Sequence, residues 1–226
     1  MFKAELQLWF MTQILVFGDS IAYGAWDREG GWVQRLRRFL EKKMASDQEV
    51  SYAVYNCGVS GDTTADLLKR FEVECYARYH ESVEIYKESF IVFFSIGMND
   101  TQFLNNKASI RISKDEFKNN IKKLIELARK FTSNIIFVGF QPIEESKVSP
   151  LPWNRNISYK YDYVEMYDKI VQSICKETNL PFIDIFNQFS KTDYKKLLED
   201  GVHPNSEGHK KIFEIVKEFL VKNKMI

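Results

Sequence analysis

Short apolar runs alternate with amphipathic stretches from one end of the chain to the other. The apolar runs cover residues 14–17, 50–55, 90–96, 135–138 and 181–185. Each run is nearly continuous in apolar or β-branched residues, which is typical of strands covered on both faces. The pattern therefore predicts five buried strands in a parallel sheet.

The stretches between these runs carry apolar residues at helical spacing. One apolar face is repeated within residues 32–40, 117–125, 164–174 and 212–220. Ser113 and Glu116 have capping-box spacing in front of the second helix. Strands that alternate with helices predict right-handed crossovers and a doubly wound sheet, whose ligand crevice opens at the carboxyl ends of the strands. Functional side chains are expected directly after strands.

The chain is expected to fold as one domain spanning residues 1–226, because 226 residues bury a continuous core. Neither an internal repeat nor a Pro/Gly/Ser-rich linker divides it. Residues 1–10 add nothing periodic before Met11, and they are a candidate non-native or disordered extension. One long irregular stretch runs from residue 141 to about residue 158.

Charge and cysteine content narrow the partners and the location. The 32 basic and 31 acidic residues give a net charge of +1, so a nucleic-acid partner is not expected. The basic run Arg35, Arg37, Arg38 is interpreted as a solvated helix face. Three widely spaced cysteines favour reduced thiols, and we find neither a secretory signal nor an apolar run long enough to span a membrane. These observations predict a cytoplasmic protein.

Four short motifs contain residues with catalytic chemistry, and three of them follow predicted strands. They are Gly18-Asp19-Ser20, Ser60-Gly61-Asp62, Gly97-Met98-Asn99-Asp100 and Asp200-Gly201-Val202-His203. A serine esterase needs a hydroxyl, an imidazole that activates it and a carboxylate that holds the imidazole tautomer. Ser20, His203 and Asp200 can supply all three groups, with the last two on one tight turn.

The tetrahedral intermediate of such a reaction also needs hydrogen-bond donors for its oxyanion. Gly61 can bring its backbone amide close to a substrate, and Asn99 adds an uncharged side-chain donor. The backbone amide of Ser20 is the third candidate. These residues complete a predicted site that requires neither metal nor cofactor.

The segments GDSIAYG, NCGVSGDT, SIGMND and DGVHPN resemble the four sequence blocks of the SGNH (GDSL-like) hydrolase family, in the family's order. The resemblance covers almost the whole chain. It implies a flavodoxin-like three-layer α/β/α sandwich and assigns Ser20, Gly61, Asn99 and His203 to the four name-giving positions, with Asp200 completing the triad. Ile21, Cys57 and Gly58 depart from the commonest residues, but none removes a functional group.

The resemblance implies a reaction class more than a substrate. We expect hydrolysis of a small carboxylic ester, with short-chain or acetyl esters favoured. Acyl transfer, or lysophospholipase or thioesterase activity, would use the same triad. A non-catalytic module that binds carbohydrate or an acyl chain is the alternative from another class, and it would be marked by loss of the serine or histidine, both of which are present.

Simpler roles remain open for several residues. Ser20 could only cap a helix, Asn99 could belong to a turn, and His203 could lie in a surface turn before the last helix. Trp153 and Tyr159 lie in or beside the irregular stretch and are predicted either to line the substrate pocket or to pack that loop onto the sheet. His80 and His209 are expected to be structural or exposed; ligand spacing for a metal is absent from the sequence.

Overall fold

The computed structural model describes residues 10–47, 50–79 and 89–226. Its main sheet contains five parallel strands in the order β2-β1-β3-β6-β8. These strands are β1 (Phe10–Gly18), β2 (Val50–Gly58), β3 (Ser89–Ser95), β6 (Asn134–Val138) and β8 (Phe182–Ile183). Counted along the chain, this is the 2-1-3-4-5 order of flavodoxin-like folds. The predicted fold class is confirmed.

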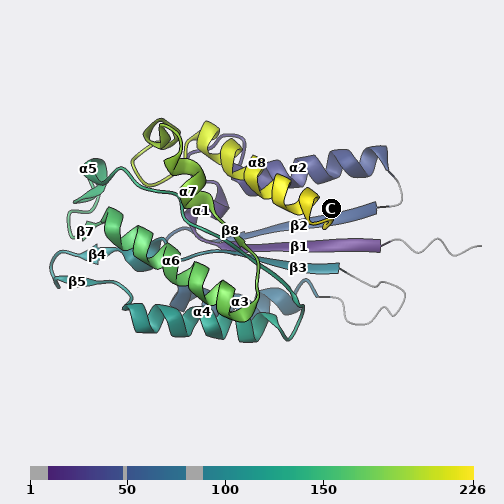
Figure 1. Ribbon diagram of the computed structural model, residues 1–226, viewed down its shortest axis with the longest axis horizontal. Helices are drawn as coiled ribbons and strands as arrows, with labels where there is room; N and C mark the ends of the chain where they lie inside the picture. The colour runs from purple at the N-terminus through teal and green to yellow at the C-terminus, as the bar shows by residue number, and fades with distance from the viewer. Residues whose placement is uncertain (1–9, 48–49, 80–88) are drawn as a thin grey trace, which may run out of the picture.

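Helices cover both faces of the sheet and complete the three layers (Figure 1). α2 (Gly31–Ser46) and α8 (Ser206–Lys222) pack together on one face. On the other face α4 (Lys114–Ala128) lies between α3 (Thr64–Tyr76) and α6 (Tyr161–Thr178). α2, α4, α6 and α8 contain the four predicted helical stretches. α3 was missed, although Leu67, Phe71 and Cys75 follow helical spacing and are buried.

Two strands differ from the sequence prediction. β1 begins at Phe10, so one residue of the predicted extension pairs within the sheet; the rest of that extension lies outside the described residues. β2 was predicted to be buried on both faces, which is wrong, because seven of its nine residues are only half-buried. β2 is an edge strand, so it has a neighbouring strand on one side only.

A second, small antiparallel sheet lies beyond the carboxyl ends of the main strands, at the left of Figure 1. It joins β4 (Phe103–Leu104) to β5 (Ser109–Ile110) and β7 (Ile157–Ser158). α5 (Glu145–Val148) lies beside it within the stretch predicted to be irregular. α1 (Ser20–Tyr23), α7 (Ile185–Ser190) and two 3-10 turns, η1 (Asn99–Thr101) and η2 (Tyr194–Leu197), complete the described elements.

The core places aromatic rings between the sheet and the layer of α3, α4 and α6. Phe71 of α3 packs against Phe17 and Phe94, with ring centroids 4.7 and 5.4 Å apart, and Phe137 continues the cluster at 5.1 Å from Phe94. Offset and tilted aromatic contacts of this kind add to the stabilisation from apolar burial. The cluster makes a rigid base for the loops at the carboxyl ends of the strands.

Two further sequence predictions concern the state of the cysteines and membrane-spanning segments. Cys57, Cys75 and Cys175 are buried free thiols. Burial raises the pKa of Cys57 and of Cys175 to about 12, so both stay protonated and unreactive at neutral pH. Within the described ranges, no helix is both long enough and apolar enough to cross a bilayer.

Candidate active site

Ser20 lies on the turn that joins β1 to α1. Gly18 ends the strand where a Cβ atom would come within 2.4 Å of the Ser95 carbonyl oxygen, so the turn needs glycine there. The Asp19 carboxylate accepts a hydrogen bond from the Ile21 amide at 2.9 Å and caps α1. Because Asp19 takes the cap, Ser20 is the first residue of the helix and its hydroxyl is not needed as a cap.

The Ser20 hydroxyl meets the ring of His203, which lies 183 positions away in the sequence. Ser20 Oγ is 2.8 Å from His203 Nε2, and His203 Nδ1 is 2.7 Å from Asp200 Oδ2. The second carboxylate oxygen of Asp200 accepts the backbone amides of Val202 and His203 at 2.9 and 2.8 Å. The structure thus brings together the three predicted residues in a continuous hydrogen-bonded chain.

The surroundings of Asp200 stabilise its ionised form. Partial burial would raise the pKa of this carboxyl, but the His203 ring and the two backbone amides outweigh burial and lower it. An ionised Asp200 holds the Nδ1–H tautomer of His203, which leaves Nε2 free to accept a proton. Asn205 caps α8 by accepting the Gly208 amide at 3.1 Å, so the cap of the last helix does not need His203 either.

The stretch after β6 fixes the loop that carries Asp200 and His203. The Gln141 side-chain amide donates to the Val202 carbonyl at 2.8 Å, and the Glu144 backbone amide donates to the Gly201 carbonyl at 2.8 Å. Gly201 has a φ of 96°, and a Cβ atom there would come within 2.9 Å of the Val148 side chain. A glycine is therefore required at the centre of this turn.

Gly61 and Asn99 lie at the ends of the two strands that flank β1. Gly61 has a φ of 87°, and the space where its Cβ atom would stand is open, so a substrate can approach its backbone closely. Asn99 is buried in η1, and its Nδ2 donates to the Asp62 carbonyl at 3.0 Å. A side-chain amide carries two N–H groups, so the second is available to another acceptor.

Two buried side chains fix the orientation of the Asn99 amide. Asn99 Oδ1 accepts the Tyr159 hydroxyl at 2.9 Å and the Gln102 Nε2 at 3.0 Å. Gln102 Nε2 also donates to the Tyr159 oxygen at 2.7 Å, and its carbonyl accepts from Arg111 at 2.9 Å. Because Oδ1 is held by donors, the amide cannot flip and Nδ2 stays directed toward the Asp62 carbonyl. The sequence analysis did not find Gln102 or Arg111.

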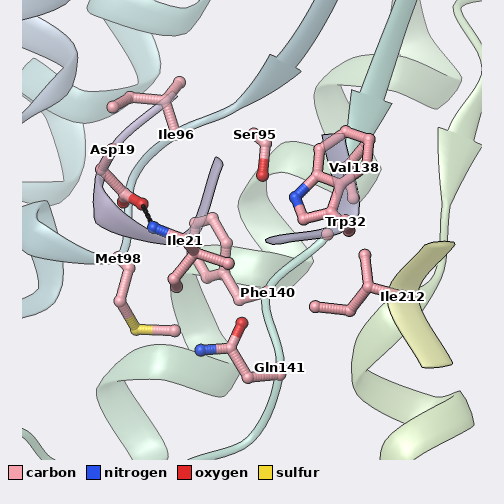
Figure 2. Close-up of a pocket in the computed structure, with 11 residues that line it drawn as sticks. Asp19, Ile21, Trp32, Ser95, Ile96, Met98, Val138, Phe140, Gln141 and Ile212 are labelled. Atoms are coloured by element: carbon pink, nitrogen blue, oxygen red, sulfur yellow. Dashed lines mark hydrogen bonds between the residues drawn. The ribbon is translucent and has the colours of Figure 1, made fainter. Parts of the chain in front are cut away.

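A narrow cavity of about 10 Å³ lies beside the turn that joins β1 to α1 (Figure 2). Apolar side chains form much of its wall, among them Ile21, Ile96 and Phe140, and the Asp19 carboxyl faces it. This burial raises the pKa of Asp19 to about 6, against the lowering effect of the Ile21 amide and of His203. Asp19 therefore stabilises the turn through its hydrogen bond to Ile21, although burial makes its charged form less favourable.

Buried polar contacts also tie the loops together. Arg70 donates to the Asp62 carboxylate at 2.8 Å and to the Gly18 carbonyl at 3.3 Å, which links the loop after β2 to the end of β1. The Asp100 carboxylate is fully buried and accepts the backbone amide and the hydroxyl of Thr64. Burial raises the pKa of Asp100 to about 7.

The two predicted pocket residues and the two other histidines differ in burial and in their contacts. Tyr159 is only 4% exposed and contacts Asn99, so its hydroxyl supports the site from behind. Trp153 is 58% exposed on the loop between α5 and β7. His209 is buried, with Nε2 at 3.2 Å from the Ala25 carbonyl, as expected of a structural histidine; His80 lies outside the described residues. Among the described residues, no cluster of three or more His, Cys, Asp or Glu side chains is placed to hold a metal ion.

Known proteins match this chain over most of its length. The family profile described as GDSL-like lipase/acylhydrolase matches residues 14–216. An acetylxylan esterase of Geobacillus stearothermophilus is 28% identical over 171 residues, which cover 71% of this chain and 68% of that protein. A protein of Bacillus subtilis named uncharacterized lipoprotein YqeF is 24% identical over 216 residues, covering 87% and 82% of the two chains.

A solved structure shows the same architecture. The W215I variant of Axe2, an acetyl xylan esterase from Geobacillus stearothermophilus, superposes with a TM-score of 0.67 at 26% identity. The match covers 92% of this chain and 93% of that one. The similarity therefore extends over the main sheet and both helical layers.

Proposed function

The chain belongs to the GDSL-like lipase/acylhydrolase family of ester-hydrolysing enzymes, and on that premise we propose that it cleaves carboxylic esters through an acyl-enzyme on Ser20. The observation that carries this proposal is the hydrogen-bonded chain from Ser20 Oγ to His203 Nε2, at 2.8 Å, and from His203 Nδ1 to Asp200, at 2.7 Å. A serine hydroxyl is a weak nucleophile unless a base takes its proton as it attacks.

In the first half of the reaction Ser20 Oγ attacks the ester carbonyl carbon while His203 Nε2 takes the hydroxyl proton. The carbonyl π electrons move to the oxygen, giving a tetrahedral oxyanion. When that intermediate collapses, the bond to the alcohol oxygen breaks and His203 returns its proton to the departing alcohol. Asp200 stays ionised and stabilises the imidazolium formed between the two transfers.

In the second half water attacks the acyl-enzyme. His203 takes a proton from the water, and the collapse of the second tetrahedral intermediate returns a proton to Ser20 Oγ and releases the carboxylic acid. The oxyanion of both intermediates is assigned to three donors, which are the backbone amides of Ser20 and Gly61 and the Asn99 Nδ2. The fixed orientation of Asn99 supports this assignment, because donors held in place need no rearrangement during the reaction.

Acetyl or other short-chain esters are the proposed substrates. The similarity to an acetylxylan esterase supports an acetyl group on the acid side and a sugar on the alcohol side. We also propose that the protein acts in the cytoplasm; the relative named a lipoprotein makes a membrane-anchored form the alternative. Fractionation of the native cells, with detection by antibody, separates these locations.

The proposed activity is tested by the initial rates of p-nitrophenyl ester hydrolysis from acetate to palmitate. Native protein is compared with the Ser20→Ala and His203→Ala variants. The proposal requires turnover of the short esters and a loss of at least about a hundredfold in both variants. Equal inertness of all three proteins across the series would contradict it and favour a binding module.

Acyl transfer to a sugar or alcohol remains the second enzymatic candidate, since it shares the first half-reaction. Product analysis with added acceptor alcohols distinguishes the two. Hydrolysis predicts free acid as the main product at all acceptor concentrations, whereas a transferase forms a new ester in proportion to the acceptor.

A further inference from the structure

The loop that follows the nucleophile turn displays two aromatic side chains to solvent. Tyr23 is 60% exposed and Trp26 is 64% exposed. Together with Arg28, Gln34 and neighbouring backbone they line an open hollow of about 740 Å³. Large aromatic side chains usually bury most of their surface, so two of them on one hollow indicate a binding surface.

The hollow lies at the end of α1, the short helix that begins with Ser20. Within the single turn of α1, Ile21 and Ala22 are buried, whereas Ser20 and Tyr23 lie three residues apart on the outer side. The backbone amides of Gly24 and Ala25, which also line the hollow, both donate to the Ser20 carbonyl at 3.0 Å. The wall of the hollow is therefore hydrogen-bonded to the backbone of Ser20, and Tyr23 extends it along the same side of α1.

The backbone of Trp26 is held in an unfavourable conformation. Its φ is 66°, in the left-handed region that bulky residues rarely adopt. Strain of this kind persists only where the surrounding structure enforces it, and it is common in ligand-binding loops. A glycine or asparagine would occupy this position with less strain, so the presence of tryptophan needs another explanation.

The residues before and after Trp26 in the sequence are hydrogen-bonded to buried parts of the protein. The Ala25 carbonyl accepts from His209 of α8 at 3.2 Å. The Asp27 carboxylate is buried and accepts from the Gly31 amide at 3.1 Å and from Arg35 at 3.0 Å. Arg35 also donates to the Ser206 hydroxyl at 2.8 Å. These contacts fix the loop to the helix that follows the His203 loop, and the indole is the part that projects outward.

The same contacts correct one sequence prediction. The run Arg35, Arg37, Arg38 was interpreted as a solvated face, and the last two do form exposed ion pairs with glutamates. Arg35 is different, because its side chain is only 17% exposed and binds the buried Asp27. Arg35 lies where α2 meets Asp27 and the start of α8, and it holds the loop there.

We propose that Tyr23 and Trp26 form the binding site for a sugar ring on the alcohol side of the ester. The flat C–H face of a pyranose stacks on an indole or phenol ring, and its hydroxyl groups pair with polar side chains such as Arg28 and Gln34 at the same hollow. An acyl chain would need an enclosed apolar channel, and this hollow is open and mixed in polarity. The inference rests on the proposed function, since it assigns the attacking hydroxyl to Ser20.

The first experiment compares two acetyl esters in a pH-stat assay, ethyl acetate and an acetylated xylo-oligosaccharide. Trp26→Gly removes the ring and tolerates a φ of 66°, so it should keep the melting temperature of the native protein. We expect Trp26→Gly to lose about tenfold in kcat/KM on the sugar ester and to keep its rate on ethyl acetate. Trp26→Tyr, which retains a stacking ring, should keep most of the sugar-ester activity.

Two outcomes of this assay would overturn the inference. One is an unchanged kcat/KM of Trp26→Gly on the sugar ester. The other is an equal loss on both esters, which would mean that the indole supports the fold of the site and does not bind the sugar.

Saturation-transfer NMR with xylotriose keeps the inference separate from the proposed function, because this sugar carries no ester. Signal transfer to the sugar protons with native protein, and its loss in Trp26→Gly, would support the binding site even if neither ester is hydrolysed. Absence of transfer with native protein would contradict it even if the enzyme is active.

Discussion

The two sides of Ser20 are built in different ways. On the side proposed to supply the base, called the base side, Asp200 and His203 belong to one short loop, three residues apart, with side chains 15% and 18% exposed. On the side proposed to bind the oxyanion, called the oxyanion side, Asn99 is oriented by Gln102 and by Tyr159, which is 60 residues away, and all three are buried. The base side combines a contact within one loop with hydrogen bonds from the stretch after β6 to the loop backbone, whereas the oxyanion side depends on buried side-chain contacts. Substitutions on the base side should therefore change the catalytic rate with little effect on stability, whereas substitutions on the oxyanion side should change both.

The largest effect is expected from His203→Ala. Loss of the base leaves Ser20 unactivated, and kcat/KM on p-nitrophenyl acetate should fall by about 10⁴-fold or more. The melting temperature should change little, because the ring is partly exposed and lies on a loop that backbone contacts hold. Steady-state kinetics and thermal unfolding measure both. A loss of less than tenfold would show that the base side has been assigned to the wrong residue.

Asn99→Ala should cost less. Removal of one oxyanion donor reduces the rate by about 10²- to 10³-fold, and most of the loss should appear in kcat. This variant should also unfold at a lower temperature than the native protein, because it leaves Tyr159 and Gln102 without their shared acceptor. An unchanged kcat would contradict the assignment of Asn99 to the oxyanion hole.

Tyr159→Phe tests whether positioning on the oxyanion side matters to the reaction. It keeps the ring and removes the hydroxyl that donates to Asn99 Oδ1, so we expect kcat to fall about tenfold with KM nearly constant. Tyr167→Phe is the matched control, because it is also buried and loses a hydroxyl that donates to the Ile112 carbonyl. Both variants should lose similar stability. Equal kcat losses in the two would indicate a structural role only.

The smallest expected effect is the pH dependence of stability, which arises from the carboxyl groups of Asp200 and Asp100. The pKa of Asp200 is lowered, so its stabilising contribution is present above the unfolded pKa of 3.8 and is lost only in stronger acid. The pKa of Asp100 is raised to about 7 by burial, so the native state holds its proton more tightly and this group lowers stability as the pH rises from about 4 to about 7.

Asp100→Asn therefore has a predicted pH dependence. Its melting temperature relative to the native protein should improve by a few degrees between pH 5 and pH 8, because only the native protein then carries a buried charge. Thermal unfolding at the two pH values measures this difference. A difference that stays constant between the two pH values would contradict this prediction, because it would mean that Asp100 is already ionised in the native protein at pH 5.

The sequence was informative where structure is local. Gly18-Asp19-Ser20 and Asp200-Gly201-Val202-His203 are short turns whose carboxylates accept backbone amides within the same turn, and the strand before Ser20 has a clear apolar pattern. The role of Tyr159 could not be predicted in this way. It follows from the pairing of β4 with β7, which aligns Phe103 with Ser158 and so brings Gln102 near Tyr159. Strands of two residues have no periodicity to detect.

The burial of polar side chains could not be predicted from the sequence either. Arg35 and Arg38 have the same side chain and lie three residues apart in one helix, yet one binds a buried carboxylate and the other is exposed. Their difference comes from the contact of α2 with the start of α8, which joins segments about 170 residues apart. A periodic pattern identifies the inner face of a helix but not the partner that this face meets.

The central claim is that Ser20 forms the covalent intermediate. The most direct measurement is to inactivate the native protein with diisopropyl fluorophosphate and to locate the adduct by peptide mass spectrometry. We predict one phosphoryl group for each chain, bound to Ser20, and at least a hundredfold slower labelling in His203→Ala, since the same base activates the serine toward phosphorus. An adduct on another residue, or ester hydrolysis that persists when Ser20 is fully labelled, would contradict the account.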